Sequence, residues 1–155
     1  MAISEKVKKL LDENKVKYEV RRHEKAFTAQ GLARADHVSG KNVAKVVLLK
    51  SKSGPSMAVL QAHRMLDLSA AQRALGERGV YLADEADFQN LFPDCEIGAM
   101  SPFGNLYDIP VFVDRGLAAD EGIEFNAGTH TEAVRIKYAD FARLARPVVA
   151  DLAVE

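Results

Sequence analysis

The sequence predicts one α+β domain over residues 1–155, with a mixed, partly antiparallel curved sheet surrounded by helices. The 155 residues are 48% hydrophobic and 28% charged, which suits a folded domain with a single core. Two apolar runs, 43–50 and 56–62, are joined by turn-forming residues and indicate a central hairpin. Other helices and strands are interleaved without the regular alternation of a doubly wound sheet, so we expect mixed strand directions.

Capping residues and hydrophobic spacing place the other elements. Ser4 can cap a first helix, because Val7, Leu10 and Leu11 follow it at helical spacing. We expect helices over 4–14, 28–36, 70–75, 85–91 and 138–145, with Ser4, Thr28, Ser69 and Asp84 as the N-caps of the first four. We expect further strands over 18–23, 79–82, 109–114, 123–128 and 133–137.

Charge is segregated along the chain. Residues 1–52 hold 13 Lys or Arg against 6 Asp or Glu, a balance of +7, whereas the remainder holds 8 against 16, a balance of −8. The basic part is either a surface that meets a polyanion or a solvated first helix and hairpin.

Several classes of function are disfavoured. No phosphate-binding P-loop, dinucleotide fingerprint or GxSxG elbow is found, so ATP hydrolysis and hydride transfer are not expected. The four histidines lack the close spacing of metal ligands, and we predict no metal and no cofactor. The single cysteine, Cys95, lies between two acidic residues that oppose its ionisation, which favours a structural role.

Nothing in the sequence indicates a membrane partner. Apolar stretches are only a few residues long, and the first residues open directly into an amphipathic pattern without a signal-peptide core. We therefore expect a cytoplasmic protein.

Lys45 is the most informative residue, because it lies inside the apolar run 43–49. A strand there directs Lys45 to the same face as Val43, Val47 and Leu49. It is either a lysine of an edge strand that extends to water or an ammonium held at a cleft to bind phosphate or developing negative charge.

A second feature is the loop 98–104, with the sequence Gly-Ala-Met-Ser-Pro-Phe-Gly. Its glycines and proline favour an ordered turn over a helix or strand. The loop is either a tight connection or a set of backbone amides that converge on an oxygen, with Gly98 allowing close approach of a ligand.

Three segments together resemble the YbaK-type and prolyl-tRNA synthetase editing-domain family. They are residues 41–48, the loop 98–103 and the Asn-Ala-Gly-Thr-His segment 126–130. Their order and separation match, and the resemblance covers essentially the whole chain. It implies an aminoacyl-tRNA deacylase, which hydrolyses the ester between a wrong amino acid and the terminal adenosine of a tRNA.

The resemblance also implies the roles of individual residues. Lys45 is then required beside the terminal nucleotide, the loop 98–102 shapes the amino-acid pocket, and His130 belongs to a segment of the same pocket. His130 is otherwise a turn histidine bonded to its own backbone. The expected catalytic residues are Lys45, Gly98 and His130, and the expected substrate-binding residues are Thr28, Ala99, Met100, Ser101, Pro102, Gly128 and Thr129.

An aminoacyl ester is already activated, so a positioned water and a stabilised oxyanion suffice without a covalent nucleophile. We expect the loop amides to hold the carbonyl oxygen while Lys45 fixes the terminal phosphate or ribose. Arg21, Arg22 and Lys41 are expected to contact the phosphates of the tRNA acceptor end.

The expected substrate is a tRNA mischarged with a small amino acid such as alanine or serine, and the chain length suggests a free-standing enzyme. Transient association with a synthetase and the oligomeric state are left open. Two alternatives remain at this point: a non-catalytic tRNA- or nucleic-acid-binding module of the same fold, and a hydrolase of small amino-acid esters.

Overall fold

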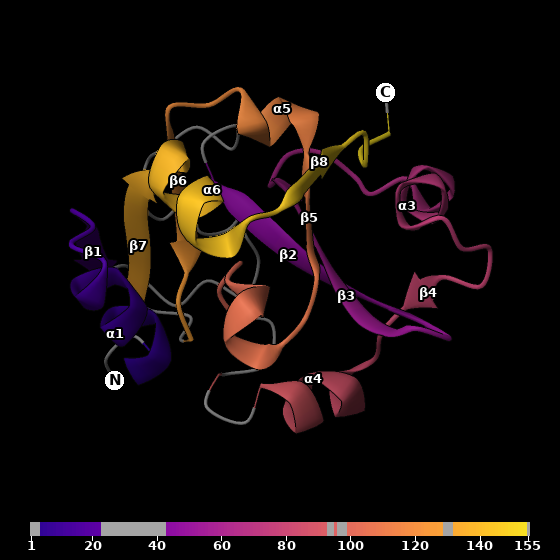
Figure 1. The fold of residues 1–155 in the computed structure, drawn as a ribbon, viewed down its shortest axis with the longest axis horizontal. Coiled ribbons are helices and arrows are strands. Elements are labelled where there is room, and N and C mark those ends of the chain that lie inside the picture. The colour runs from indigo at the N-terminus through magenta and orange to yellow at the C-terminus, as the bar shows by residue number, and fades with distance from the viewer. Residues whose placement is uncertain (1–3, 23–42, 93–94, 96–98, 129–131, 155) are drawn as a thin grey trace.

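The computed structural model describes residues 4–22, 43–92, 95, 99–128 and 132–154. The helix expected over 28–36 and the turn expected over 38–42 lie outside these residues. Where the chain is described, its strands and helices form the mixed α/β arrangement that the sequence predicts (Figure 1).

The strands form two sheets. A three-stranded antiparallel sheet has the order β1-β7-β6, and a five-stranded mixed sheet has the order β4-β2-β3-β5-β8. In the second sheet, β3 pairs antiparallel with β2 and parallel with β5. The strands are β1 (Glu19–Arg22), β2 (Ala44–Ser51), β3 (Gly54–Gln61), β4 (Tyr81–Leu82), β5 (Val111–Asp114), β6 (Gly122–Asn126), β7 (Glu132–Lys137) and β8 (Val148–Ala150).

An isolated parallel bridge between Val43 and Glu124 joins the two sheets. Val43 directly precedes β2, and Glu124 lies in the middle of β6, so these two strands run side by side at this point.

Helices cover both faces of the five-stranded sheet. They are α1 (Glu5–Glu13), α3 (Leu68–Leu75), α4 (Glu85–Leu91), α5 (Arg115–Ala118) and α6 (Tyr138–Ala145), with a 3₁₀ helix η1 (Gly104–Tyr107). Residues of α1 and α6 enter the larger core, whereas α3 covers the opposite face beside β4 (Figure 1).

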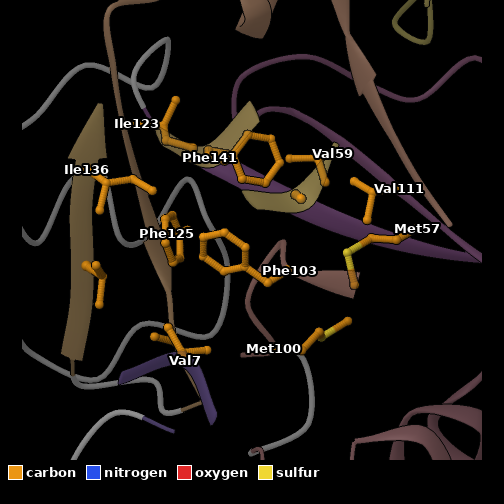
Figure 2. Packing of buried hydrophobic residues seen from close by; sticks show 14 of the residues in the cluster. Val7, Met57, Val59, Met100, Phe103, Val111, Ile123, Phe125, Ile136 and Phe141 are labelled. Atoms are coloured by element: carbon orange, nitrogen blue, oxygen red, sulfur yellow. The ribbon is translucent and has the colours of Figure 1, made fainter. Parts of the chain in front are cut away.

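The larger core lies where both sheets meet α1, α6 and the 99–103 loop. Phe103 from the loop is fully buried, and its ring makes edge-to-face contacts with Phe125 of β6 and Phe141 of α6, each at 5.6 Å between centroids. Met100 from the same loop packs near Met57 of β3 (Figure 2). The loop is therefore anchored by its own side chains.

A smaller core lies on the other face of the five-stranded sheet. It contains Leu49, Ala58 and Ala71, with Val80 and Leu152. Because residues of a strand alternate between faces, Leu49 and Val47 share this face with Lys45. The predicted face of Lys45 is thus confirmed.

Most of the expected elements that fall in the described residues are confirmed, with small changes at the caps. Ser4 occupies the N-cap of α1 without a side-chain cap bond. The predicted Ser69 cap is wrong, because the Asp67 side chain accepts from the amides of Ser69 and Ala70. Asp84 caps α4 by accepting from the Asp87 amide at 3.1 Å. The short elements α5, η1 and β8 were not expected.

Within the residues that the structure describes, no helix is both long and apolar enough to cross a membrane.

Candidate functional site

Lys45 is the second residue of β2 and pairs with Leu60 of β3. The Val43–Glu124 bridge supplies a strand on the other side, so β2 has neighbours on both sides at this end. The edge-strand interpretation of Lys45 is therefore wrong. The lysine extends from a continuous surface of strands.

The surroundings of Lys45 are apolar. Val43, which directly precedes β2, and Leu60, which lies opposite Lys45, are both fully buried, and Lys45 itself is half-buried. Burial lowers the pKa of the Lys45 ammonium below its ordinary value, because desolvation disfavours the charged form. Among the described residues, none forms a hydrogen bond or ion pair with the Lys45 side chain.

The loop residues Ala99, Met100, Ser101 and Pro102 are all buried. This burial, which includes the backbone, fixes the course of the loop. None of the described residues accepts a hydrogen bond from the amides of Ala99, Met100 or Ser101. The Ser101 hydroxyl accepts from the Phe103 amide at 3.4 Å, which holds the turn.

Strand β6 connects Lys45 to this loop. The Gly128 amide, two residues beyond the end of β6, donates to the Ala99 carbonyl at 2.7 Å. Glu124, at the other end of the same segment, bridges to Val43 beside Lys45. Residues 124 and 128 of an extended segment are about 13 Å apart, at roughly 3.3 Å a residue. One short segment thus contacts both predicted parts of the site.

Gly128 suits this position. Its φ is +109°, which side chains rarely tolerate, and a Cβ there would lie 3.2 Å from the Ser4 Cβ. The neighbouring Ala127 carbonyl accepts from the Ser4 amide at 2.7 Å. The start of α1 therefore packs directly against the turn that holds the loop.

Two polar residues of β6 were not among the predicted site residues. Glu124 is fully buried and Asn126 is 8% exposed, and both share the face of Val43 and Lys45 through the parallel bridge. Ile123 and Phe125 point into the larger core. The alternation in 123–126 was visible in the sequence. Only the fold shows that the polar side of this strand is buried.

Glu124 pairs with a predicted tRNA-binding residue. The Arg21 Nη1 lies 3.6 Å from Glu124 Oε1, and Arg21 Nη2 lies 3.3 Å from Glu19 Oε2. Arg21 thus neutralises a carboxylate beneath the candidate site. Its predicted contact with tRNA, like that of Arg22, stays a prediction.

Asn126 has an unusual environment. Its Oδ1 is buried and has no hydrogen-bond partner in the part of the chain that the structure describes. Buried polar atoms are nearly always paired, so an unpaired acceptor on the Lys45 face indicates a place for an incoming donor.

The remaining predicted residues lie outside the described residues. They are Gly98 and His130 of the catalytic set, Thr28 and Thr129 of the substrate-binding set, and Lys41 of the tRNA-binding set. Their roles stay predictions.

Two other features lie away from Lys45. Cys95 packs against the larger core, and its Sγ lies 3.6 Å from the Tyr107 hydroxyl. An open groove of about 770 Å³ lies at the start of β6 and the end of β7, with Gly122 and Arg135 in its lining. Among the described residues, no three His, Cys, Asp or Glu side chains are grouped to hold a metal ion.

Comparison with known proteins places this arrangement in a family. Residues 23–144 match the family described as the aminoacyl-tRNA editing domain. The prolyl-tRNA editing protein ProX of Acetoanaerobium sticklandii is 23% identical over 142 residues, which cover 88% of this chain and 86% of that protein.

Solved structures share the fold. A candidate trans-editing enzyme for prolyl tRNA synthetase superposes with a TM-score of 0.82 at 21% identity, covering 97% of this chain and 96% of that one. The hypothetical protein APE2540 superposes with a TM-score of 0.84 at 18% identity, covering 97% and 100%. Because the family match spans most of its length, the chain belongs to the aminoacyl-tRNA editing domain family, which acts on mischarged tRNA, and is a hydrolase of the aminoacyl-tRNA deacylase class.

Proposed function

We propose that this chain acts in trans, as a free-standing enzyme, on tRNA mischarged with a small amino acid such as alanine or serine. The observation that carries the proposal is the path along β6, from the Val43–Glu124 bridge beside Lys45 to the Gly128–Ala99 hydrogen bond at the loop. The relative named as a prolyl-tRNA editing protein makes a tRNA for proline the first one to test.

In the proposed reaction, water adds to the ester carbonyl carbon, and the ribose oxygen leaves with a proton. The amides of the 99–101 residues hold the carbonyl oxygen as it becomes an oxyanion. Such donors act strongly where water is excluded, and losing one costs about 10²–10³ in rate. The burial of Met100 and Phe103 fixes these amides before the substrate arrives.

Lys45 holds the terminal phosphate or ribose of the tRNA. Its stem emerges between apolar neighbours, and its ammonium has no other partner in the described part of the chain. A half-buried ammonium without a partner destabilises the fold, and an anion bound to it offsets this destabilisation. Arg21, Arg22 and Lys41 are proposed to add contacts to the acceptor end.

The test is deacylation of a panel of mischarged tRNAs, with alanine, serine and cysteine on tRNA for proline and on a second tRNA. We expect turnover of a small amino acid, and a rate that falls steeply between low and moderate salt because phosphate contacts release counterions. Hydrolysis of a free amino-acid ester with no response to salt would favour a small-ester hydrolase. Tight tRNA binding without any turnover would favour a binding module.

A further inference from the structure

We propose that Asn126 binds the α-ammonium group of the amino acid to be removed and thereby makes the enzyme select substrates with a free amine. This inference rests on the proposed function and names a substrate contact within that site. The residue lies at the end of β6, between the part of the site built on Lys45 and the part built on the loop.

The placement of Asn126 follows from the strand register. Val43 pairs in parallel with Glu124, so residues two further along each strand, Lys45 and Asn126, emerge on the same face. Two residues beyond Asn126, the Gly128 amide binds the Ala99 carbonyl. At about 3.3 Å a residue, Asn126 is roughly 7 Å along the chain from that contact.

The chemistry follows from the groups that the substrate end carries. The phosphate, ribose and ester carbonyl need donors, which Lys45 and the loop amides supply. The α-ammonium instead needs an acceptor, because it carries only donors. Asn126 Oδ1 is such an acceptor: it is buried and has no hydrogen-bond partner among the described residues.

Two other acceptors near Asn126 in sequence or contact have partners among the described residues. Glu124 is paired with Arg21, and the Ala99 carbonyl accepts from Gly128.

The consequence is selectivity. A site with a buried acceptor penalises a ligand that cannot donate to it, because the acceptor is then left desolvated and unpaired. Aminoacyl-tRNA with a free amine is therefore preferred over tRNA whose acyl group lacks the amine.

The experiment is a two-by-two comparison of kcat/KM. Wild type and Asn126→Leu are each tested on alanyl-tRNA and on propionyl-tRNA, which differ only in the α-amine. Because both enzymes are tested on the same two esters, the comparison cancels the difference in intrinsic reactivity between the esters. We expect Asn126→Leu to lose about 10- to 100-fold on alanyl-tRNA and to stay within about threefold on propionyl-tRNA.

Two controls separate this role from a structural one. Asn126→Asp keeps an acceptor and should keep the preference for alanyl-tRNA. Ser56→Ala removes another buried polar group, at the far end of β3, and should affect both esters equally. Asn126→Leu should also melt no lower than wild type, since it removes an unpaired buried acceptor.

An equal loss on both esters, or Asn126→Asp that loses the preference, would overturn the assignment while the deacylase activity of the wild type stands. A wild type that hydrolyses neither ester would overturn the proposed function and this inference together.

Discussion

The amide nitrogen of Gly128 lies 2.7 Å from the carbonyl oxygen of Ala99, so the turn after β6 holds the first described residue of the buried loop. These residues are 29 positions apart in the printed sequence. The same β6 segment bridges to Val43 beside Lys45. The geometry of the candidate site therefore depends on one strand and its C-terminal turn.

Gly128→Ala should impair activity through this contact. Its φ of +109° and the 3.2 Å approach of a Cβ to Ser4 together should cost about 1–3 kcal/mol and displace the loop. Gly54→Ala is the matched control, because Gly54 has a φ of +108° with nothing within 4 Å of its Cβ position. Urea unfolding and deacylation rates should show destabilisation in both variants and at least a tenfold rate loss in Gly128→Ala alone. Equal activity in the two variants would argue against a role for the contact.

Arg21→Met should destabilise the fold by about 1–3 kcal/mol, because it removes a half-exposed charged partner from the fully buried Glu124. The double variant Arg21→Met/Glu124→Gln should recover part of this loss, since no buried carboxylate remains. Both are measured by urea unfolding. If the double variant is no more stable than Arg21→Met alone, the Arg21–Glu124 pair contributes little to stability.

Lys45→Met should not destabilise the fold. Burial lowers the pKa of Lys45 in the folded state, so at neutral pH its charge costs stability. The variant should therefore be as stable as wild type or more stable, by no more than about 0.5 kcal/mol. Between the folded pKa and the ordinary lysine value the unfolded chain binds more protons, so wild-type stability rises with pH there. The advantage of Lys45→Met should then shrink in alkaline solution.

This prediction is checked by urea unfolding at neutral and alkaline pH, with Lys52→Met in the exposed β2–β3 turn as control. An advantage that grows with pH would contradict the assigned direction of the Lys45 pKa.

Asp114 should be a main stabiliser of the C-terminal segment. Its Oδ1 accepts from the amides of Leu152 and Ala153 at 2.8 and 3.1 Å, and its Oδ2 accepts from Gly116 at 2.9 Å. Asp114→Ala should cost about 3 kcal/mol, because three buried or half-buried donors lose a charged acceptor. Asp114→Asn should cost less, since one oxygen remains. Urea unfolding measures both variants, and equal midpoints for Asp114→Ala and Asp114→Asn would show that the remaining oxygen contributes nothing.

Local sequence signals predicted much of the fold. The two apolar runs 43–50 and 56–62, with the turn between them, were sufficient to predict the central hairpin, and Lys45 lies on the predicted face. The short α5 and β8 were missed because four and three residues carry no periodicity. Ser69 was chosen as a cap over Asp67, although either side chain can accept from the amides of a first turn.

The site could be predicted only in part. Residue types and segment order pointed to Lys45 and the 98–102 loop. The Val43–Glu124 bridge joins segments 81 positions apart in the printed sequence, and no local pattern encodes such a pairing. Glu124 and Asn126 were therefore assigned to no site, although their spacing placed them on one face.

The most direct test of the proposed mechanism is single-turnover deacylation of alanyl-tRNA for proline by wild type, Lys45→Ala and Lys52→Ala at saturating enzyme. If Lys45 and the loop form the site, Lys45→Ala should lower the rate about 10²–10³-fold and Lys52→Ala should leave it within about twofold. A Lys45→Ala variant that deacylates as fast as wild type would contradict the assignment of this site.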